Sequence, residues 1–158
     1  MGKKDASVNL FVYGTLRCEE RQRITPDRFD IPAFRRNAFL ETRKILDDAP
    51  FFGFATTSGK LFDVGRYPGM IEGEGQVYGE VYQVEPDDLS MIDLLEGFDP
   101  ENLSESHYLR QEVELMVNGN EKLNGEAYYY NLEIDHLPLI PSGDYCQYLE
   151  AQRSMEKP

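Results

Sequence analysis

The segment from Gln76 to Val84 constrains the fold most strongly, because its apolar residues lie on both faces of a predicted strand. Val77, Val81 and Val84 are interleaved with two tyrosines in this segment. Such a pattern is typical of a central strand that other elements cover on both sides. Glu80 in the middle of this strand is then either a site residue or a carboxylate at the rim of a barrel.

Most of the other strand patterns are separated by turn signals rather than by helices. The predicted strands are residues 8–13, 51–57, 60–64, 76–84, 109–117 and 127–130, and the predicted helices are residues 33–49, 87–96 and 143–152. Ser58-Gly59 predicts a hairpin turn, Glu72–Gly75 predicts a loop, and Asn118-Gly119 predicts a second turn. Six or seven strands with two or three helices predict an α+β fold, a small mixed β-barrel with flanking helices.

The first predicted strand ends in a turn that is a candidate binding site. Val8, Leu10 and Val12 alternate with other residues, and the pattern stops at Gly14. A glycine at this point permits a sharp turn whose backbone N–H groups converge on an anion. The alternative is that Gly14 only ends the strand while Tyr13 packs in the core.

The helix at 87–96 carries a candidate catalytic carboxylate. Its start follows Pro86, and Gly97 is placed to end it. Leu89, Ile92 and Glu96 share one stripe of the helix, so the Glu96 side chain is predicted to point inward. Partial burial would raise its pKa and make it a better base near neutral pH. The alternatives are a buried structural glutamate held by a tyrosine or a backbone N–H, and Asp93 as the functional carboxylate.

Composition limits the function classes. The 158 residues are 41% hydrophobic and 28% charged, which predicts one globular domain over residues 1–158, with residues 1–7 and 154–158 as frayed termini. The net charge of −13 argues against a nucleic-acid or anionic-membrane partner. No segment resembles a signal peptide or a membrane span, so a cytoplasmic location is expected. The cysteines and histidines lack the spacing of metal ligands, and no metal or cofactor is predicted.

Six stretches of the chain, in order, resemble the motifs of the gamma-glutamylcyclotransferase-like family. They are Phe11–Arg17, Ser58–Gly69 with Phe62 where tyrosine is usual, Val77–Tyr82, Ile92–Gly97, Tyr108–Arg110, and Ile140–Tyr145 with Tyr145 in place of tryptophan. Together they cover most of residues 10–149. The segment from Cys18 to Asp48 is longer than is usual in the family, which leaves the shape of the pocket mouth and the choice of substrate open.

The resemblance implies an enzyme that releases 5-oxoproline from a gamma-glutamyl amine or peptide, a small-molecule substrate. The substrate's own α-amine attacks its γ-carbonyl, and a carboxylate serves as the base and then as the acid. The family's catalytic glutamate falls on Glu96. The turn formed by Tyr13, Gly14, Thr15 and Leu16 would hold the glutamyl end, and Tyr130 would bound the pocket. Tyr82 and Tyr108 are expected to be packing residues.

Two other functions are compatible with the sequence. The chain is either a binding module that holds a small acidic metabolite in the same pocket, or an acyltransferase that passes the glutamyl group to another amine. The presence of Glu96 favours the cyclotransferase over the binding module. The sequence predicts neither the leaving amine nor an oligomeric state.

Overall fold

A computed structural model describes residues 7–17, 21–22, 33–65 and 67–156, apart from the side chains of residues 33–35 and 155–156. The strands are β1 (Val8–Val12), β2 (Phe51–Asp63), β3 (Pro68–Val84), β4 (Tyr108–Val117) and β5 (Glu121–Tyr130). The helices are α2 (Ala33–Asp48), α3 (Pro86–Glu96), the short 3₁₀ helix η3 (Leu103–Glu105) and α4 (Tyr145–Glu156). Residues 154–156, expected to be frayed, belong to α4.

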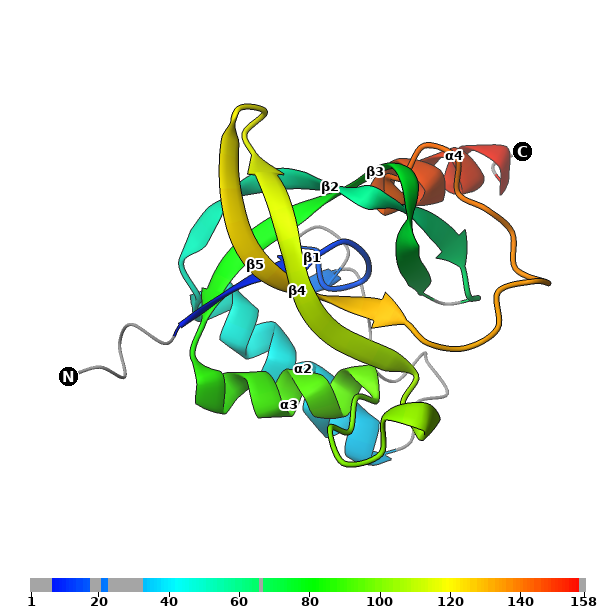
Figure 1. Ribbon diagram of the computed structural model, residues 1–158. Coiled ribbons are helices and arrows are strands. Elements are labelled where there is room, and N and C mark those ends of the chain that lie inside the picture. Colours follow the sequence, from blue (N-terminus) through cyan, green and yellow to red (C-terminus); the bar gives the residue numbers. More distant parts are fainter. Residues whose placement is uncertain (1–6, 18–20, 23–32, 66, 157–158) are drawn as a thin grey trace.

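The five strands close into a barrel in the order β1-β3-β2-β4-β5 (Figure 1). All neighbouring strands are antiparallel except β1 and β5, which meet in parallel where Leu10 pairs with Glu126. This arrangement confirms the predicted small mixed barrel with flanking helices. It also brings the end of β1 close to both β3 and β5, which is where the candidate binding turn begins.

The predicted hairpin at Ser58-Gly59 is wrong. Both predicted strands belong to the continuous strand β2, and the predicted loop Glu72–Gly75 is part of the long strand β3. The pairing of β2 with β3 shifts register between Ser58 and Lys60, so these residues form an irregularity within a ladder rather than a turn. The described residues therefore form five long strands instead of the expected six or seven.

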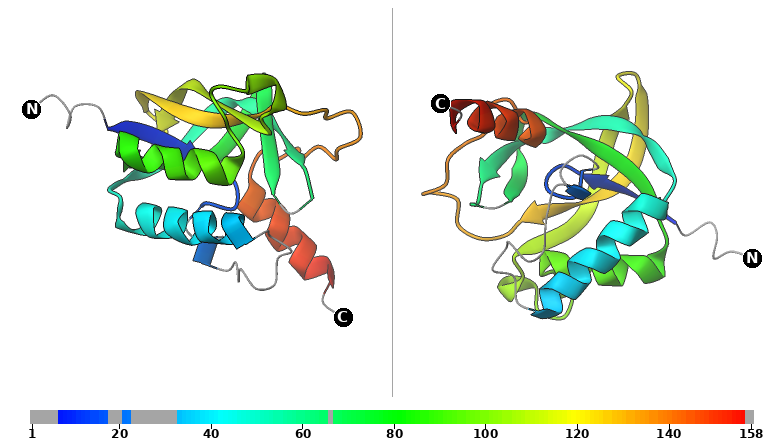
Figure 2. Two further views of the ribbon diagram at one scale, coloured as in Figure 1. Left: turned by 90° about the horizontal axis from the view of Figure 1, so that it is seen from below. Right: turned by 180° about the vertical axis from the view of Figure 1, so that it is seen from behind.

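Two hydrophobic clusters hold the helices to the barrel. One fills the barrel and includes Phe11, Tyr13 and Tyr129. The other lies between the barrel and the helices α2 and α3, and it includes Leu10 and Leu46. Figure 2 shows α2 and α3 together on one side of the barrel and α4 on another. Successive residues of β1 thus serve both clusters, as the alternation of a strand requires.

Helices α2 and α3 agree closely with the predicted helices. Part of the segment from Cys18 to Asp48 is now accounted for, because its second half forms α2, which packs on α3. The loop and helical turn predicted for residues 18–29 lie mostly outside the described residues. None of the helices in the described part of the chain is both long and apolar enough to cross a membrane.

Candidate active site

The turn after β1 is fixed by contacts from β3 and β5. The buried Tyr13 hydroxyl donates to the Tyr128 carbonyl at 2.7 Å and accepts the Met70 N–H at 3.1 Å. Gly14 lies so close to Pro68 that an added Cβ would be 2.6 Å from the proline Cγ. The Gly14 carbonyl accepts the Arg17 N–H at 3.0 Å, which closes the turn. Only a residue without a side chain fits at position 14.

The middle of this turn presents backbone donors. Among the described residues, no acceptor lies within hydrogen-bond distance of the Thr15 and Leu16 N–H groups. The Leu16 side chain is buried, and its carbonyl accepts the Arg21 guanidinium at 2.8 Å. The turn is thus anchored on both sides of two adjacent amides, which is an arrangement suited to binding an oxygen atom of a ligand.

Glu96 is the last residue of α3 and is half-buried. Pro86 begins the helix and Gly97 ends it in the left-handed conformation, with φ 70° and ψ 35°. The Glu96 carboxylate lies near Tyr13, whose pKa is raised first by burial and then by this negative charge. The structure therefore brings the predicted base and the predicted binding turn together, although they are far apart in the sequence.

Three buried tyrosines feel the negative charge of Glu96, and we call Tyr13, Tyr108 and Tyr128 the tyrosine wall. Burial raises the pKa of Tyr13, Tyr108 and Tyr128, and the charge of Glu96 raises each of them further. The Tyr108 hydroxyl donates to the Pro68 carbonyl at 2.7 Å, and the Tyr128 hydroxyl donates to Asp93 Oδ1 at 2.6 Å. Each hydroxyl has a single proton, which is already given to a fixed acceptor, so none of the three donates to Glu96.

Tyr130 extends this wall at the end of β5. Its ring meets that of Tyr108 edge-on, with the centroids 5.3 Å apart. The ring also covers the backbone of Gly69, where an added Cβ would lie 2.7 Å from Tyr130 Cγ. Tyr130 is therefore held against the same start of β3 that holds Tyr13. Tyr108 packs in the core as expected, and the charge of Glu96 contributes to its raised pKa after burial and the nearby Tyr13.

The rival carboxylates are both engaged by arginines. Asp93 accepts bonds from Arg110 Nε at 2.9 Å and Nη2 at 3.1 Å, in addition to the Tyr128 hydroxyl. Glu80 is 5% exposed, accepts the Tyr82 hydroxyl at 2.7 Å and lies 3.5 Å from Arg17 Nε. Both rival carboxylates therefore serve as ion-pair partners of arginines.

Several residues that shape the site carry no clear signal in the sequence. Arg21 joins the Leu16 carbonyl to the Tyr82 hydroxyl and to Asp47, so Tyr82 is more than a packing residue. Arg110 and Tyr128 reach Asp93 from β4 and β5. The sequence did indicate a place near the site for Tyr128, because this residue lies two positions before Tyr130 and therefore on the same face of the strand.

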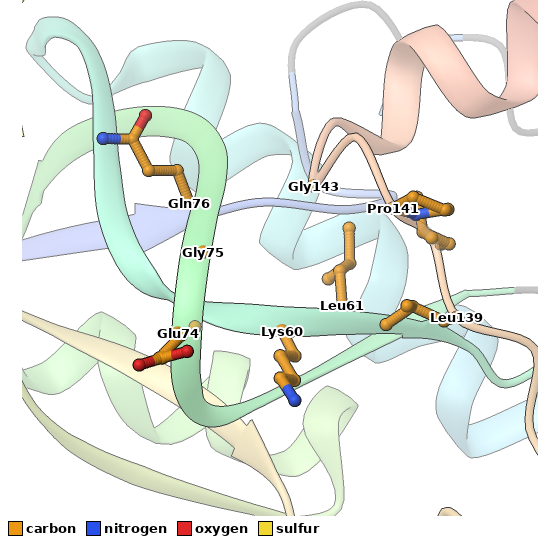
Figure 3. A pocket seen from close by; sticks show the side chains of 10 residues that line it. Lys60, Leu61, Glu74, Gly75, Gln76, Leu139, Pro141 and Gly143 are labelled. Carbon is orange, nitrogen blue, oxygen red and sulfur yellow. The ribbon is translucent and has the colours of Figure 1, made fainter.

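A separate hollow of about 110 Å³ lies beside the β2–β3 ladder and the loop before α4 (Figure 3). None of its lining residues belongs to the predicted site; they are Gly59, Lys60, Leu61, Glu74, Gly75, Gln76, Leu139, Ile140, Pro141 and Gly143. The side chains of Lys60, Glu74 and Gln76 point in different directions in Figure 3 and do not converge on one point. The hollow therefore adds no chemistry to the candidate site.

The buried tyrosine wall predicts a loss of stability at alkaline pH. In the unfolded chain these tyrosines ionise near pH 10.0, whereas in the folded protein their raised pKa keeps them protonated. The folded state then binds more protons above about pH 10, so the free energy of unfolding falls as the pH rises. Urea unfolding across this range should show the decline, and ionisation of the wall should coincide with unfolding. Complete tyrosinate absorbance in a protein that stays folded would contradict this.

Comparison with known proteins agrees with the motifs in the sequence. A sequence profile of the family described as "Gamma-glutamyl cyclotransferase, AIG2-like" matches residues 10–147. The gamma-L-glutamyl-butirosin B gamma-glutamyl cyclotransferase of Niallia circulans is 33% identical over 141 residues, covering 89% of this chain and 76% of that protein. The gamma-glutamylcyclotransferase family protein YtfP of Escherichia coli strain K12 is 27% identical over 138 residues, covering 87% of this chain and 96% of YtfP.

Among solved structures, YkqA from Bacillus subtilis superposes with a TM-score of 0.65 at 24% sequence identity. The superposition covers 94% of this chain and 43% of YkqA, so the chain spans less than half the length of that protein. This likeness shows a shared fold. The profile match over most of the chain and the relative in Niallia circulans extend the likeness from fold to sequence. The chain therefore belongs to the gamma-glutamyl cyclotransferase, AIG2-like family.

Proposed function

We propose that this protein releases 5-oxoproline from a gamma-glutamyl amine or peptide, with Glu96 as the general acid and base. The observation that carries the proposal is the position of Glu96. Its half-buried carboxylate lies at the end of α3, and its negative charge acts on Tyr13, the first residue of the turn that presents the Thr15 and Leu16 amides. Membership of the family supports the reaction type, and the match of its catalytic glutamate to Glu96 supports the choice of that residue.

In this mechanism Glu96 takes a proton from the substrate's α-ammonium group. The freed amine attacks the γ-carbonyl carbon and forms the N–C bond of a five-membered lactam. The nitrogen loses its second proton as the ring closes, and the bond from the γ-carbon to the leaving nitrogen breaks. Both protons end on the leaving amine, Glu96 returns to the carboxylate, and no water is consumed. One group therefore acts as base and acid in turn.

The turn after β1 and Tyr130 would fix the substrate's conformation. In the proposed complex the Thr15 and Leu16 amides bind an oxygen atom of the glutamyl group, and Tyr130 closes one side of the pocket. Because attacking and attacked atoms belong to one molecule, holding the chain folded supplies much of the rate acceleration. A wall of neutral, oriented tyrosines keeps the surroundings of the reacting groups low in dielectric, which strengthens these interactions.

The proposal is tested by measuring 5-oxoproline release from a panel of gamma-glutamyl compounds. The panel contains gamma-glutamyl amino acids, gamma-glutamyl-ε-lysine and glutathione, and the products are identified by mass spectrometry. We expect stoichiometric release of 5-oxoproline and the free amine from at least one class. Thermal stabilisation by these compounds without turnover would favour a binding module instead. Transfer of the glutamyl group to an added amine would identify an acyltransferase.

A further inference from the structure

The last turn of α3 is tied to the barrel through Asp93. This residue is 8% exposed and accepts three hydrogen bonds, two from Arg110 on β4 and one from Tyr128 on β5. The two bonds from Arg110 form the parallel fork of a guanidinium and a carboxylate, which fixes direction as well as distance. The helix therefore cannot rotate or slide at this point without breaking a partly buried ion pair.

A second set of contacts fixes the chain just beyond Glu96. The Asp93 carbonyl accepts the Phe98 N–H at 2.9 Å, and the Gly97 carbonyl accepts the His107 N–H at 3.0 Å. His107 immediately precedes β4, the strand that carries Arg110. Glu96 thus lies between two anchors, both of which lead to β4. Its half-buried side chain takes its direction from a backbone that is held on either side.

The guanidinium of Arg110 remains charged and is held in place by several contacts. Burial works against its charge, but its bonds to Asp93 and Glu126 raise its pKa above the ordinary value, so it remains a cation wherever the protein is folded. Its Nη1 donates to Glu126 on the neighbouring strand β5. The guanidinium also lies 5.6 Å from the centroid of the Phe98 ring. Arg110 therefore links both strands and the chain after α3 to the carboxylate of Asp93.

We propose that Arg110 is a positioning residue for Glu96. Through its two bonds to Asp93, it holds the last turn of α3 in the one position that places the Glu96 carboxylate beside the turn after β1. The inference rests on the proposed function, because it gives Glu96 the catalytic role. Asp93 is then the residue of α3 that Arg110 binds in order to hold the helix, and it is not a second base.

The first test measures kcat and KM separately for variants of Arg110, on whichever substrate the wild type turns over. Arg110→Lys keeps the charge but loses the fork, and we expect kcat to fall about tenfold; Arg110→Met should lower it about a hundredfold, the size expected for a misplacement of about 1 Å. KM should change by less than about threefold, since the turn that binds substrate is untouched. A wild-type kcat in both variants, or a loss confined to KM, would overturn the proposal.

Glu126→Gln is the matched control, because it removes the other carboxylate partner of Arg110 and leaves the contact with Asp93. We expect its kcat to stay within about twofold of the wild type. A loss as large as that of Arg110→Met would mean that Arg110 acts through the β4–β5 pair and not through α3. The double variant Asp93→Asn with Arg110→Met should fall no further than Arg110→Met alone, because both changes release the same anchor.

Amide hydrogen exchange tests the same inference without any substrate. In Arg110→Lys and Arg110→Met, the amides of residues 92–98 should exchange about tenfold faster than in the wild type, while those of α2 and the barrel keep their rates. Faster exchange throughout the molecule would show a general structural role, and no change at residues 92–98 would show that Arg110 does not hold the helix; either result would overturn the proposal. If the wild type turns over no substrate, the proposed function fails, and the exchange result still decides whether Arg110 holds the helix.

Discussion

Replacing Glu96 by Gln should lower turnover by roughly a thousandfold while the protein stays folded. The amide is nearly the same size as the carboxylate but cannot take a proton from the α-ammonium group, and general acid–base catalysis by one residue contributes about 10² to 10⁴ in rate. Because Glu96 is half-buried at the end of α3, the substitution introduces no new steric contact. The measurement is kcat for 5-oxoproline release, with circular dichroism and urea unfolding to confirm the fold.

Three further variants make the result specific to Glu96. Glu112→Gln changes an exposed carboxylate on β4 and should leave kcat unchanged. Asp93→Asn and Glu80→Gln change the two paired carboxylates, and each should retain more activity than Glu96→Gln. If Asp93→Asn were inactive while Glu96→Gln retained turnover, the base would be Asp93 and the assignment of Glu96 would be wrong.

Replacing Gly14 by Ala should lower kcat/KM about a hundredfold, because it displaces the turn that is proposed to bind the glutamyl group. The added Cβ would lie 2.6 Å from Pro68 Cγ and 2.7 Å from Cδ, and the ring of a buried proline has no rotamer that avoids it. Overpacking of this kind also costs about 1–3 kcal/mol of the free energy of unfolding. Steady-state kinetics and urea unfolding of the same variant measure the two effects.

Gly119→Ala separates the steric effect from a general loss of stability. Gly119 has φ 87° and nothing within 4 Å of an added Cβ, so alanine there strains the backbone without touching a neighbour. We expect a stability loss of about 1 kcal/mol or more and an unchanged kcat/KM. Wild-type kcat/KM in Gly14→Ala would mean that the turn after β1 does not bind the substrate.

The periodic elements were predictable because their signals are local. Gly97 predicts the end of the helix, as observed, and Leu89 and Ile92 of the predicted stripe are buried, whereas Glu96 is half-buried. The alternation in β1 and the turn signal at Asn118-Gly119 were also sufficient. The turn predicted at Ser58-Gly59 is absent because the pairing of β2 with β3 over many residues outweighs the preference of this dipeptide for a turn.

The contacts that assemble the site were not predictable in the same way. The bond from Tyr13 to the Tyr128 carbonyl and the ion pair of Asp93 with Arg110 join residues whose proximity depends on the order of the strands. The sequence predicts which residues are inward on each element, but the closure of β1 on β5 decides which of them meet. Tyr130 was therefore identified from the family motif alone, and Tyr128 was missed.

The most direct test is to run the reaction in heavy-oxygen water and identify every product by mass spectrometry. We predict unlabelled 5-oxoproline and the free amine from the wild type, because ring closure uses the substrate's own nitrogen and no oxygen from water. Glu96→Gln should form the same products roughly a thousandfold more slowly. Labelled glutamate from the wild type would show hydrolysis in place of cyclisation. Unlabelled 5-oxoproline formed as fast by Glu96→Gln as by the wild type would contradict the role of Glu96.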